Sequence, residues 1–227
     1  MAKSNALSIL APFDYFLIIG VVACSVIYSF LSGEWDILGM VAAIAGLVNV
    51  VLCAKGSILN YLFGLINVSL YAYISFRSQL YGDFALNALY YVPMQFIGFF
   101  SWRKRGNIEN SNQVNGRRLT WKERALWGGF TVLATVIGAL VLAKLGDSYP
   151  IKDAITTIVS IIAMFLMVKA YMEQWILWIL VNLVSVYIWL QFTIAQEPHA
   201  ALMLIMWLFY TANSINGYRV WLKLSNK

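Results

Sequence analysis

All of the charged residues of this 227-residue chain lie outside eight long apolar stretches, which together make up most of its length. The stretches cover residues 15–31, 37–53, 58–76, 84–100, 125–143, 154–168, 175–195 and 200–218. A helix needs about 17 to 25 apolar residues to cross a hydrocarbon layer, and it satisfies its own backbone hydrogen bonds there. The pattern therefore predicts an all-α integral membrane protein with about eight transmembrane helices.

The composition leaves little room for a soluble catalytic domain. Hydrophobic residues make up 61% of the chain and charged residues 11%, whereas soluble proteins have about 25% charged residues. An integral membrane enzyme would need paired catalytic acids or a metal cluster, and the apolar stretches contain neither. Cys24 and Cys53 act as small hydrophobic residues there. We expect no enzyme activity, no metal and no cofactor.

The basic residues indicate how the chain is oriented in the membrane. Thirteen of the sixteen lysines and arginines share a side with the N-terminus, and only Arg77, Lys144 and Lys152 fall on the other side. Because basic residues near helix ends stay cytoplasmic, both termini are expected in the cytoplasm. The basic loop suits contact with anionic membrane lipids. It has no nucleic-acid-binding motif, so we expect no nucleic acid as a partner.

Two parts of the chain repeat one pattern. The fourth and eighth stretches match at an offset of 119 residues, and the third and seventh at an offset of 116. The matched pairs include Gly98 with Gly217, Trp102 with Trp221, Ser69 with Ser185 and Tyr71 with Tyr187. Chance similarity between apolar segments is the alternative, but the shared Gly-x-x-x-Trp argues against it. Three helices and a linker helix return the chain to its starting side, so the repeats would run parallel across the membrane.

This repeat divides the chain into four parts. Residues 1–34 form an N-terminal transmembrane helix, retained because Asp14 precedes its apolar core and no small-residue cleavage site follows. Residues 35–104 form the first three-helix repeat, and residues 105–149 form a basic cytoplasmic loop and a linker helix. Residues 150–227 form the second repeat and a C-terminal tail. The predicted fold is thus two parallel three-helix repeats joined by a linker helix, with one extra N-terminal helix.

Four carboxamide side chains, one on each of four repeat helices, are predicted to approach one layer of the membrane, with aromatic rings beside them. An unpaired amide in hydrocarbon costs on the order of a few kcal/mol, so each must face a partner, a cavity or a ligand. A hydrogen bond between helices is the alternative for any single amide. The candidate substrate-binding residues are Asn182, Trp178, Gln95, Asn67, Asn213, Tyr91, Trp175 and Tyr71.

Such a pocket suits a sugar joined to an aromatic base. Carboxamides donate to and accept from hydroxyls and amides, and aromatic faces stack on a planar ring or hold a cationic one. Proton and sodium coupling normally use carboxylates within the membrane, and the apolar stretches have none. Facilitated diffusion by alternating access is the simplest mechanism, although sodium coordinated by backbone carbonyls stays open.

A proline and three tryptophans have structural interpretations of their own. Pro93 within the fourth stretch removes a backbone hydrogen bond and predicts either a packing kink or a hinge for gating. Trp35, Trp102 and Trp221 lie near the ends of apolar stretches. They are therefore expected in the aromatic belt at the membrane interface.

Two motifs resemble the PnuC family of nicotinamide riboside transporters. They are YVPMQFIGFFSWR at residues 91–103 and QWILW at residues 174–178, followed by Asn182. The resemblance covers roughly residues 31–223, and Phe99 stands where the family often has Trp. It implies a SWEET-like fold in the bacterial inner membrane with the substrate site near the membrane centre between the repeats.

The resemblance also implies a function and partners. It implies uptake of nicotinamide riboside, made unidirectional by a cytoplasmic nicotinamide riboside kinase, and assembly as a homo-oligomer, such as a trimer. The family includes relatives that carry other B vitamins, so a riboflavin or thiamine carrier is an alternative. A substrate-binding membrane subunit of a larger transport complex is another, because such a subunit would also have a polar pocket.

Overall fold

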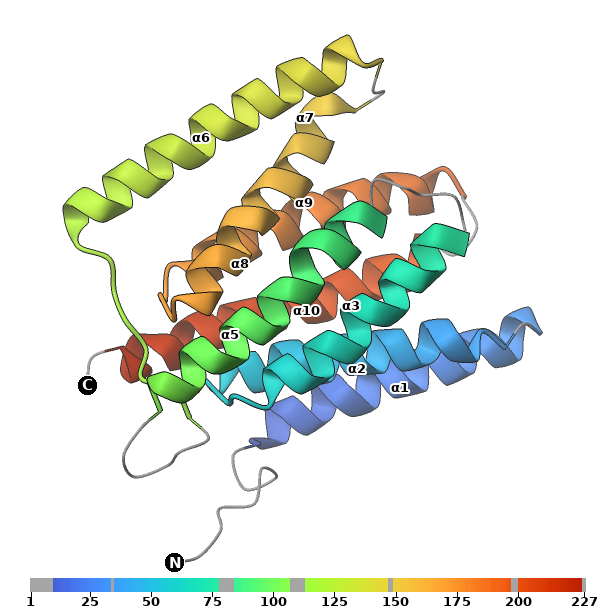
Figure 1. The fold of residues 1–227 in the computed structure, drawn as a ribbon. Helices are drawn as coiled ribbons and strands as arrows, with labels where there is room; N and C mark the ends of the chain where they lie inside the picture. The colour runs from blue at the N-terminus through green and yellow to red at the C-terminus, as the bar shows by residue number, and fades with distance from the viewer. Residues whose placement is uncertain are drawn as a thin grey trace, which may run out of the picture. The chain divides into compact units, whose positions relative to one another are not determined.

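The computed structural model describes residues 10–33, 35–77, 84–106, 113–146, 149–196 and 200–225, and its secondary structure there is helical apart from isolated bridges. The π-helix η2 continues into α5, and α7, the π-helix η3 and α8 also form one continuous helix, which gives eight helical rods in the described ranges. The elements are α1 (Pro12–Ser32), α2 (Ile37–Ala54), α3 (Asn60–Arg77), η2 (Leu86–Tyr91), α5 (Val92–Lys104), α6 (Trp121–Lys144), α7 (Pro150–Ala154), η3 (Ile155–Val159), α8 (Ser160–Val168), α9 (Gln174–Ile194) and α10 (Ala200–Leu224) (Figure 1). The all-helical fold with eight helices is thereby confirmed.

Several helices are long and apolar enough to cross a membrane. By length and composition, five helices in the described ranges meet this requirement: α1, α2, α6, α9 and the helix formed by residues 150–168. The helix that contains the sixth apolar stretch is longer than the stretch itself, because it begins at Pro150, four residues earlier. The helices α3 and α10, which carry Asn67 and Asn213, are not among these five.

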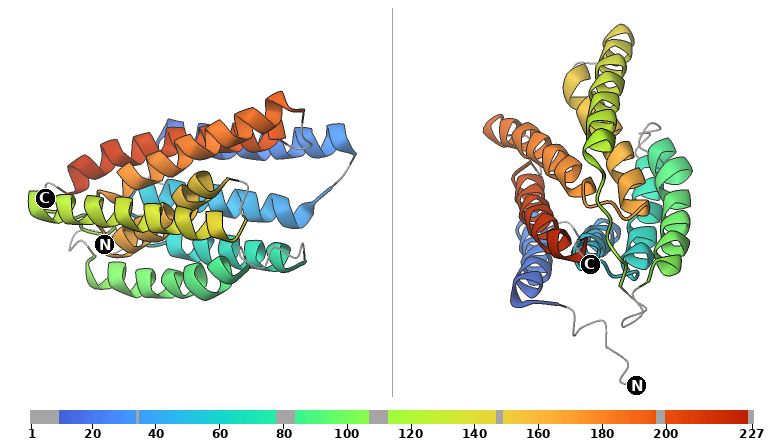
Figure 2. Two further views of the ribbon diagram at one scale, coloured as in Figure 1. Left: turned by 90° about the horizontal axis from the view of Figure 1, so that it is seen from above. Right: turned by 90° about the vertical axis from the view of Figure 1, so that its left-hand side faces the viewer.

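The chain divides into two compact units, Met1–Asn115 and Gly116–Lys227, called unit 1 and unit 2 below. Within unit 1, α2 packs against α1 and α3, and α3 also packs against η2 and α5. Within unit 2, α9 packs against α8, η3 and α10, while α6 contacts α7 and η3. Both views of Figure 2 show α9 and α10 side by side. In each unit, the second repeat helix therefore contacts both of its partners.

The turns that lead into α3 and α9 have the same backbone geometry. Gly56 and Ala170 both adopt the left-handed region, with φ of 67° and 58°. Each donates its N–H to the carbonyl three residues earlier, and the following residue donates to the carbonyl five residues earlier. Gly56 and Ala170 lie 114 positions apart, two fewer than the offset of 116 that the aromatic residues of these helices suggested. The internal repeat thus extends to the conformation of the turns.

In each unit, an aromatic ring that lies on a glycine holds two helices of the repeat together, α3 and α5 in unit 1 and α9 and α10 in unit 2. In unit 1, the ring of Tyr61 on α3 occupies the space where a side chain on Gly98 of α5 would begin. The same ring packs edge-on against Trp102, with centroids 5.0 Å apart. Small residues permit this close approach of two helices.

Unit 2 repeats this contact with a larger ring. Trp175 of α9 covers Gly217 of α10, and its ring centroid lies 6.3 Å from that of Trp221. Trp102 and Trp221 have no exposed surface. The prediction that these two rings lie in an interfacial belt is therefore wrong. Trp102 packs against α3 and Trp221 against α9, and neither ring faces lipid.

Local sequence explains where several helices begin. Asp36 accepts a hydrogen bond from the N–H of Gly39 at the start of α2. At the start of α6, the Thr120 hydroxyl accepts from the N–H of Glu123, and the Glu123 carboxylate accepts from the N–H of Thr120. This reciprocal capping box satisfies two N–H groups that have no partner within the helix.

The π-helix η2 lies directly before Pro93. It ends at Tyr91, and the N–H of Val92 donates to the carbonyl of Asn87, five residues earlier. Proline and π-helical turns are both recognised causes of irregularity in a helix. The two interpretations of Pro93, a packing kink and a gating hinge, both remain open.

We predict that Gly217→Ala and Gly98→Ala each destabilise the protein. The added Cβ would overlap the ring of Trp175 or Tyr61, and overpacking of this kind costs about 1–3 kcal/mol. The expected result is a lower thermal midpoint in detergent for both variants. Gly128→Ala is the matched control, because no described atom lies within 4 Å of its Cβ position. Equal midpoints for all three variants would contradict the ring-on-glycine contact.

Candidate functional site

Unit 2 brings four of the predicted residues together on α9 and α10. Asn182 and Trp175 are buried on one face of α9, and Trp178 is half-buried between them in sequence. The side-chain amide of Asn182 donates to the hydroxyl of Ser214 on α10 at 2.8 Å. Asn213, which is buried, directly precedes that serine. Trp175 and Asn182 of α9 therefore both contact α10 within their own unit.

The indole N–H of Trp175 is buried and has no hydrogen-bond partner among the described residues. A buried donor without an acceptor costs about 1–3 kcal/mol. The ring itself is held by Gly217 and Trp221. Its donor is thus available to a water molecule or to a ligand that accepts a hydrogen bond.

Unit 1 has a second group of amides, on α2 and α5, whose side-chain oxygens are buried. Gln95 is buried, and its Oε1 lies at the position that a Cβ on Gly64 of α3 would take. The Oδ1 of Asn49 on α2 lies 3.1 Å from the same position. Within the described part of the chain, neither oxygen accepts a hydrogen bond. Two acceptors therefore converge beside a glycine that leaves them room.

Asn67 ties two helices of unit 1 together. Its side-chain amide donates to the backbone carbonyl of Ala42 on α2 at 2.8 Å. This bond is the alternative role considered for a single carboxamide, namely a hydrogen bond between helices. Asn67 is half-buried, so the bond leaves part of its side chain exposed.

The two predicted tyrosines of unit 1 lie at the edge of the buried face. Tyr71 is 45% exposed. Tyr91 is half-buried at the end of η2, and its ring centroid lies 5.3 Å from that of Tyr90. Together with Asn67 and Gln95 they place four predicted residues on α3, η2 and α5, while the other four lie on α9 and α10. Whether the two groups form one pocket stays a prediction.

Sequence reasoning missed two polar residues of these groups. Asn49 is a single carboxamide in an otherwise apolar helix, the same signal that identified Asn67, and could have been found in the same way. Ser214 carried no such signal, because an isolated serine in a membrane helix commonly bonds to its own backbone. Its role as the acceptor for Asn182 depends on the packing of α9 against α10.

The candidate residues offer uncharged groups that can bind a ligand. The described residues hold no cluster of three His, Cys, Asp or Glu side chains that could bind a metal. What the candidate residues offer is amide donors and acceptors, an indole N–H and aromatic faces, all uncharged. Such groups recognise a planar ring with polar substituents and hydroxyls.

Comparison with known proteins points to one family. A family profile described as nicotinamide mononucleotide transporter matches residues 36–223, so the match begins after α1. The nicotinamide riboside transporter PnuC of Neisseria mucosa is 40% identical over 203 residues, which cover 88% of this chain and 76% of that protein. The riboflavin/roseoflavin transporter RibM of Streptomyces davaonensis is 27% identical over 65% of this chain and 69% of its own length.

The fold is also similar to a solved structure. The crystal structure of the vitamin B3 transporter PnuC superposes with a TM-score of 0.79 at 36% sequence identity. The superposition covers 96% of this chain and 93% of that one. The resemblance that the two sequence motifs indicated is confirmed by both comparisons.

We predict that Ser214→Ala lowers the free energy of unfolding by about 1–3 kcal/mol, because the buried amide of Asn182 loses its acceptor. The exposed Ser69 on α3 provides the control, since Ser69→Ala removes the same hydroxyl from an exposed position. Thermal unfolding in detergent measures both. A Ser214→Ala midpoint equal to that of Ser69→Ala would show that the bond contributes nothing.

Proposed function

The chain belongs to the PnuC family of membrane transporters, and from that premise we propose that it carries nicotinamide riboside across the bacterial inner membrane by facilitated diffusion. Membership makes it a multi-pass membrane transporter and not an enzyme. The substrate, the mechanism and the orientation are the proposed parts.

The absence of charge among the candidate residues is the observation that carries the choice of substrate. No lysine, arginine, aspartate or glutamate lies within the eight apolar stretches. A phosphate group buried beside them would have no counter-charge, which is costly within a membrane. This favours the riboside over the mononucleotide. The riboside presents a cationic pyridinium ring, which aromatic faces hold by cation–π attraction, and hydroxyls, which amides bind.

The proposed mechanism is alternating access without ion coupling. We place the substrate site near the membrane centre between the two repeats, where transporters with internal repeats bind their substrates. The same lack of intramembrane carboxylates that argues against a phosphate also argues against proton or sodium coupling.

Orientation and partners complete the proposal. The distribution of lysine and arginine supports cytoplasmic termini. Uncoupled transport cannot raise the internal concentration of its substrate above the external one, so accumulation requires a cytoplasmic kinase that converts the riboside to a phosphorylated product. We expect the protein to assemble as a homo-oligomer, such as a trimer.

A second candidate function is riboflavin transport, which the similarity to RibM supports. Riboflavin also joins an aromatic ring to hydroxyls, but its ring system is larger and uncharged. Competition between the two vitamins for uptake distinguishes the candidates. A substrate-binding subunit of a larger complex would bind its ligand and fail to transport it alone.

We predict that Asn182→Ala and Trp178→Ala each weaken binding of nicotinamide riboside by about 1–3 kcal/mol, the value of one lost amide or ring contact. Isothermal titration calorimetry on purified protein measures the change. Asn115→Ala and Trp121→Ala are the matched controls, because both residues are exposed outside the candidate groups. Unchanged affinity in both site variants would place the pocket elsewhere.

We also predict that purified protein in liposomes takes up labelled nicotinamide riboside at a rate independent of proton and sodium gradients. Excess unlabelled riboside should compete, whereas the mononucleotide should compete at least about tenfold less well because of its uncompensated phosphate charge. Riboflavin competing better than the riboside would favour the second candidate. Binding without uptake would favour the subunit of a larger complex.

A further inference from the structure

In unit 1, a buried ion pair joins α1 to the turn before α3. Asp14 lies in the first turn of α1 and has no exposed surface. Its Oδ2 lies 2.6 Å from Nζ of Lys55, which caps the C-terminus of α2, and it also accepts from the N–H of Ala11 at 2.6 Å. The pair therefore connects a helix that precedes the repeat to the turn within the repeat.

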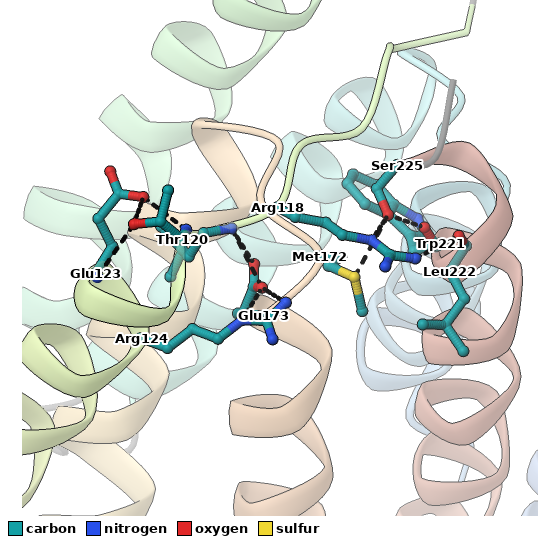
Figure 3. A network of polar contacts seen from close by, with 10 residues as sticks. Arg118, Thr120, Glu123, Arg124, Met172, Glu173, Trp221, Leu222 and Ser225 are labelled. Carbon is teal, nitrogen blue, oxygen red and sulfur yellow. Dashed lines mark hydrogen bonds and ion pairs between the residues drawn. The ribbon is translucent and has the colours of Figure 1, made fainter.

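In unit 2, a second ion pair joins α6 to the turn before α9 (Figure 3). Oε1 of Glu173 lies 2.9 Å from Nε and 2.8 Å from Nη2 of Arg124, in the first turns of α6. The N–H of Leu119 donates to both oxygens of the same carboxylate at 3.2 Å. Glu173 is buried and Arg124 is partly exposed.

The two pairs lie at equivalent turns, but at different positions within these turns and with opposite polarity. Lys55 lies at the turn that leads into α3, and Glu173 directly precedes the first residue of α9. The partner comes in both cases from the start of a helix outside the three-helix repeat, an acid on α1 and a base on α6. Because the charges are reversed, Asp14 suits Lys55 and would repel Glu173, while Arg124 suits Glu173 and would repel Lys55.

A buried ion pair adds little to stability compared with a neutral pair of similar volume, because desolvation of both charges offsets their attraction. Loss of one partner is far more damaging than loss of both, since it leaves an unpaired buried charge. Stability alone therefore gives no reason for an ion pair with a buried carboxylate at each of two equivalent turns. A role in fixing the geometry of the turn would explain why both pairs are present.

We propose that the pairs Asp14–Lys55 and Arg124–Glu173 are positioning residues for transport, each holding the turn from which α3 or α9 begins. The inference rests on the proposed transport function. These helices carry Asn67 and Asn182, the amides assigned to substrate binding. Asn182 lies eight residues beyond the start of α9, which corresponds to about 12 Å along the helix. The pairs therefore act on the movement of the helices and not on contact with the substrate.

The test compares single and double neutral variants in unit 1. Lys55→Met and Asp14→Asn each leave one buried charge unpaired and should reduce the amount of folded protein. The double variant Asp14→Asn/Lys55→Met removes both charges and should recover folded protein. In proteoliposomes we expect its initial uptake rate to fall about fivefold, with the dissociation constant of the riboside changed less than about twofold.

Unit 2 provides a matched control for Lys55. Lys169 is the repeat equivalent of Lys55, 114 positions later, but it is exposed and forms no ion pair with an acid among the described residues. Lys169→Met should leave folding, affinity and uptake rate unchanged. A folded double variant that transports at the wild-type rate overturns the proposal, as does a loss of rate in Lys169→Met equal to that of the double variant.

Unit 2 gives an independent version of the test. Glu173→Gln/Arg124→Gln should fold and should transport more slowly at unchanged affinity, with Lys122→Gln as the exposed control on the same helix turn. If the unit 1 double variant does not fold, the unit 2 double variant tests the positioning role by the same criteria. Failure of both double variants to fold overturns the proposal, because the pairs would then serve stability.

Wild-type protein in the same experiment separates this inference from the proposed function. If the wild type neither binds nor transports the riboside, the proposed function fails. If it does both and the folded double variants match it, only the positioning role fails.

Discussion

The contact of an aromatic ring with a glycine holds α3 to α5 in unit 1 and α9 to α10 in unit 2, and the rest of each unit depends on it. Tyr61 lies on Gly98, and Trp175 lies on Gly217. Lipid tails are as apolar as side chains, so close packing has to replace the hydrophobic effect as the force between helices. A ring that fills the space left by a missing side chain gives such packing. It also fixes the register in which Gln95 meets α3 and Ser214 meets α9.

The polar groups of the apolar helices follow two rules. Some are satisfied within the unit, as Asn67 is by Ala42 and Asn182 by Ser214. Others, including Oε1 of Gln95 and Nε1 of Trp175, are buried without a hydrogen-bond partner among the described residues. Since an unsatisfied buried group is costly, the second kind indicates where water or a ligand completes the structure. Charges are kept at the helix ends, where Lys55 and Glu173 find partners on neighbouring helices.

Much of the fold was accessible from sequence because the membrane imposes a strong pattern. The eight apolar stretches correspond to eight helices, and the Gly-x-x-x-Trp repeat corresponds to equivalent contacts in the two units. The candidate residues were harder to interpret. The spacing of seven residues between Trp175 and Asn182 places both on one face of a helix, but it does not identify Ser214 as the partner of Asn182. The expected interfacial position of Trp102 and Trp221 failed because position near a helix end does not reveal which way a ring points.

The sequence by itself determined the class of molecule, its division into repeats and its family, since each of these follows from the order of apolar, small and charged residues along the chain. Only the tertiary structure decided which atoms meet. The pairing of Asp14 with Lys55, the left-handed turn at Ala170 and the convergence of Asn49 and Gln95 beside Gly64 all join residues that are distant in sequence or depend on backbone geometry. The physical reason is that helical periodicity specifies the face on which a side chain lies, whereas helix packing specifies its neighbour.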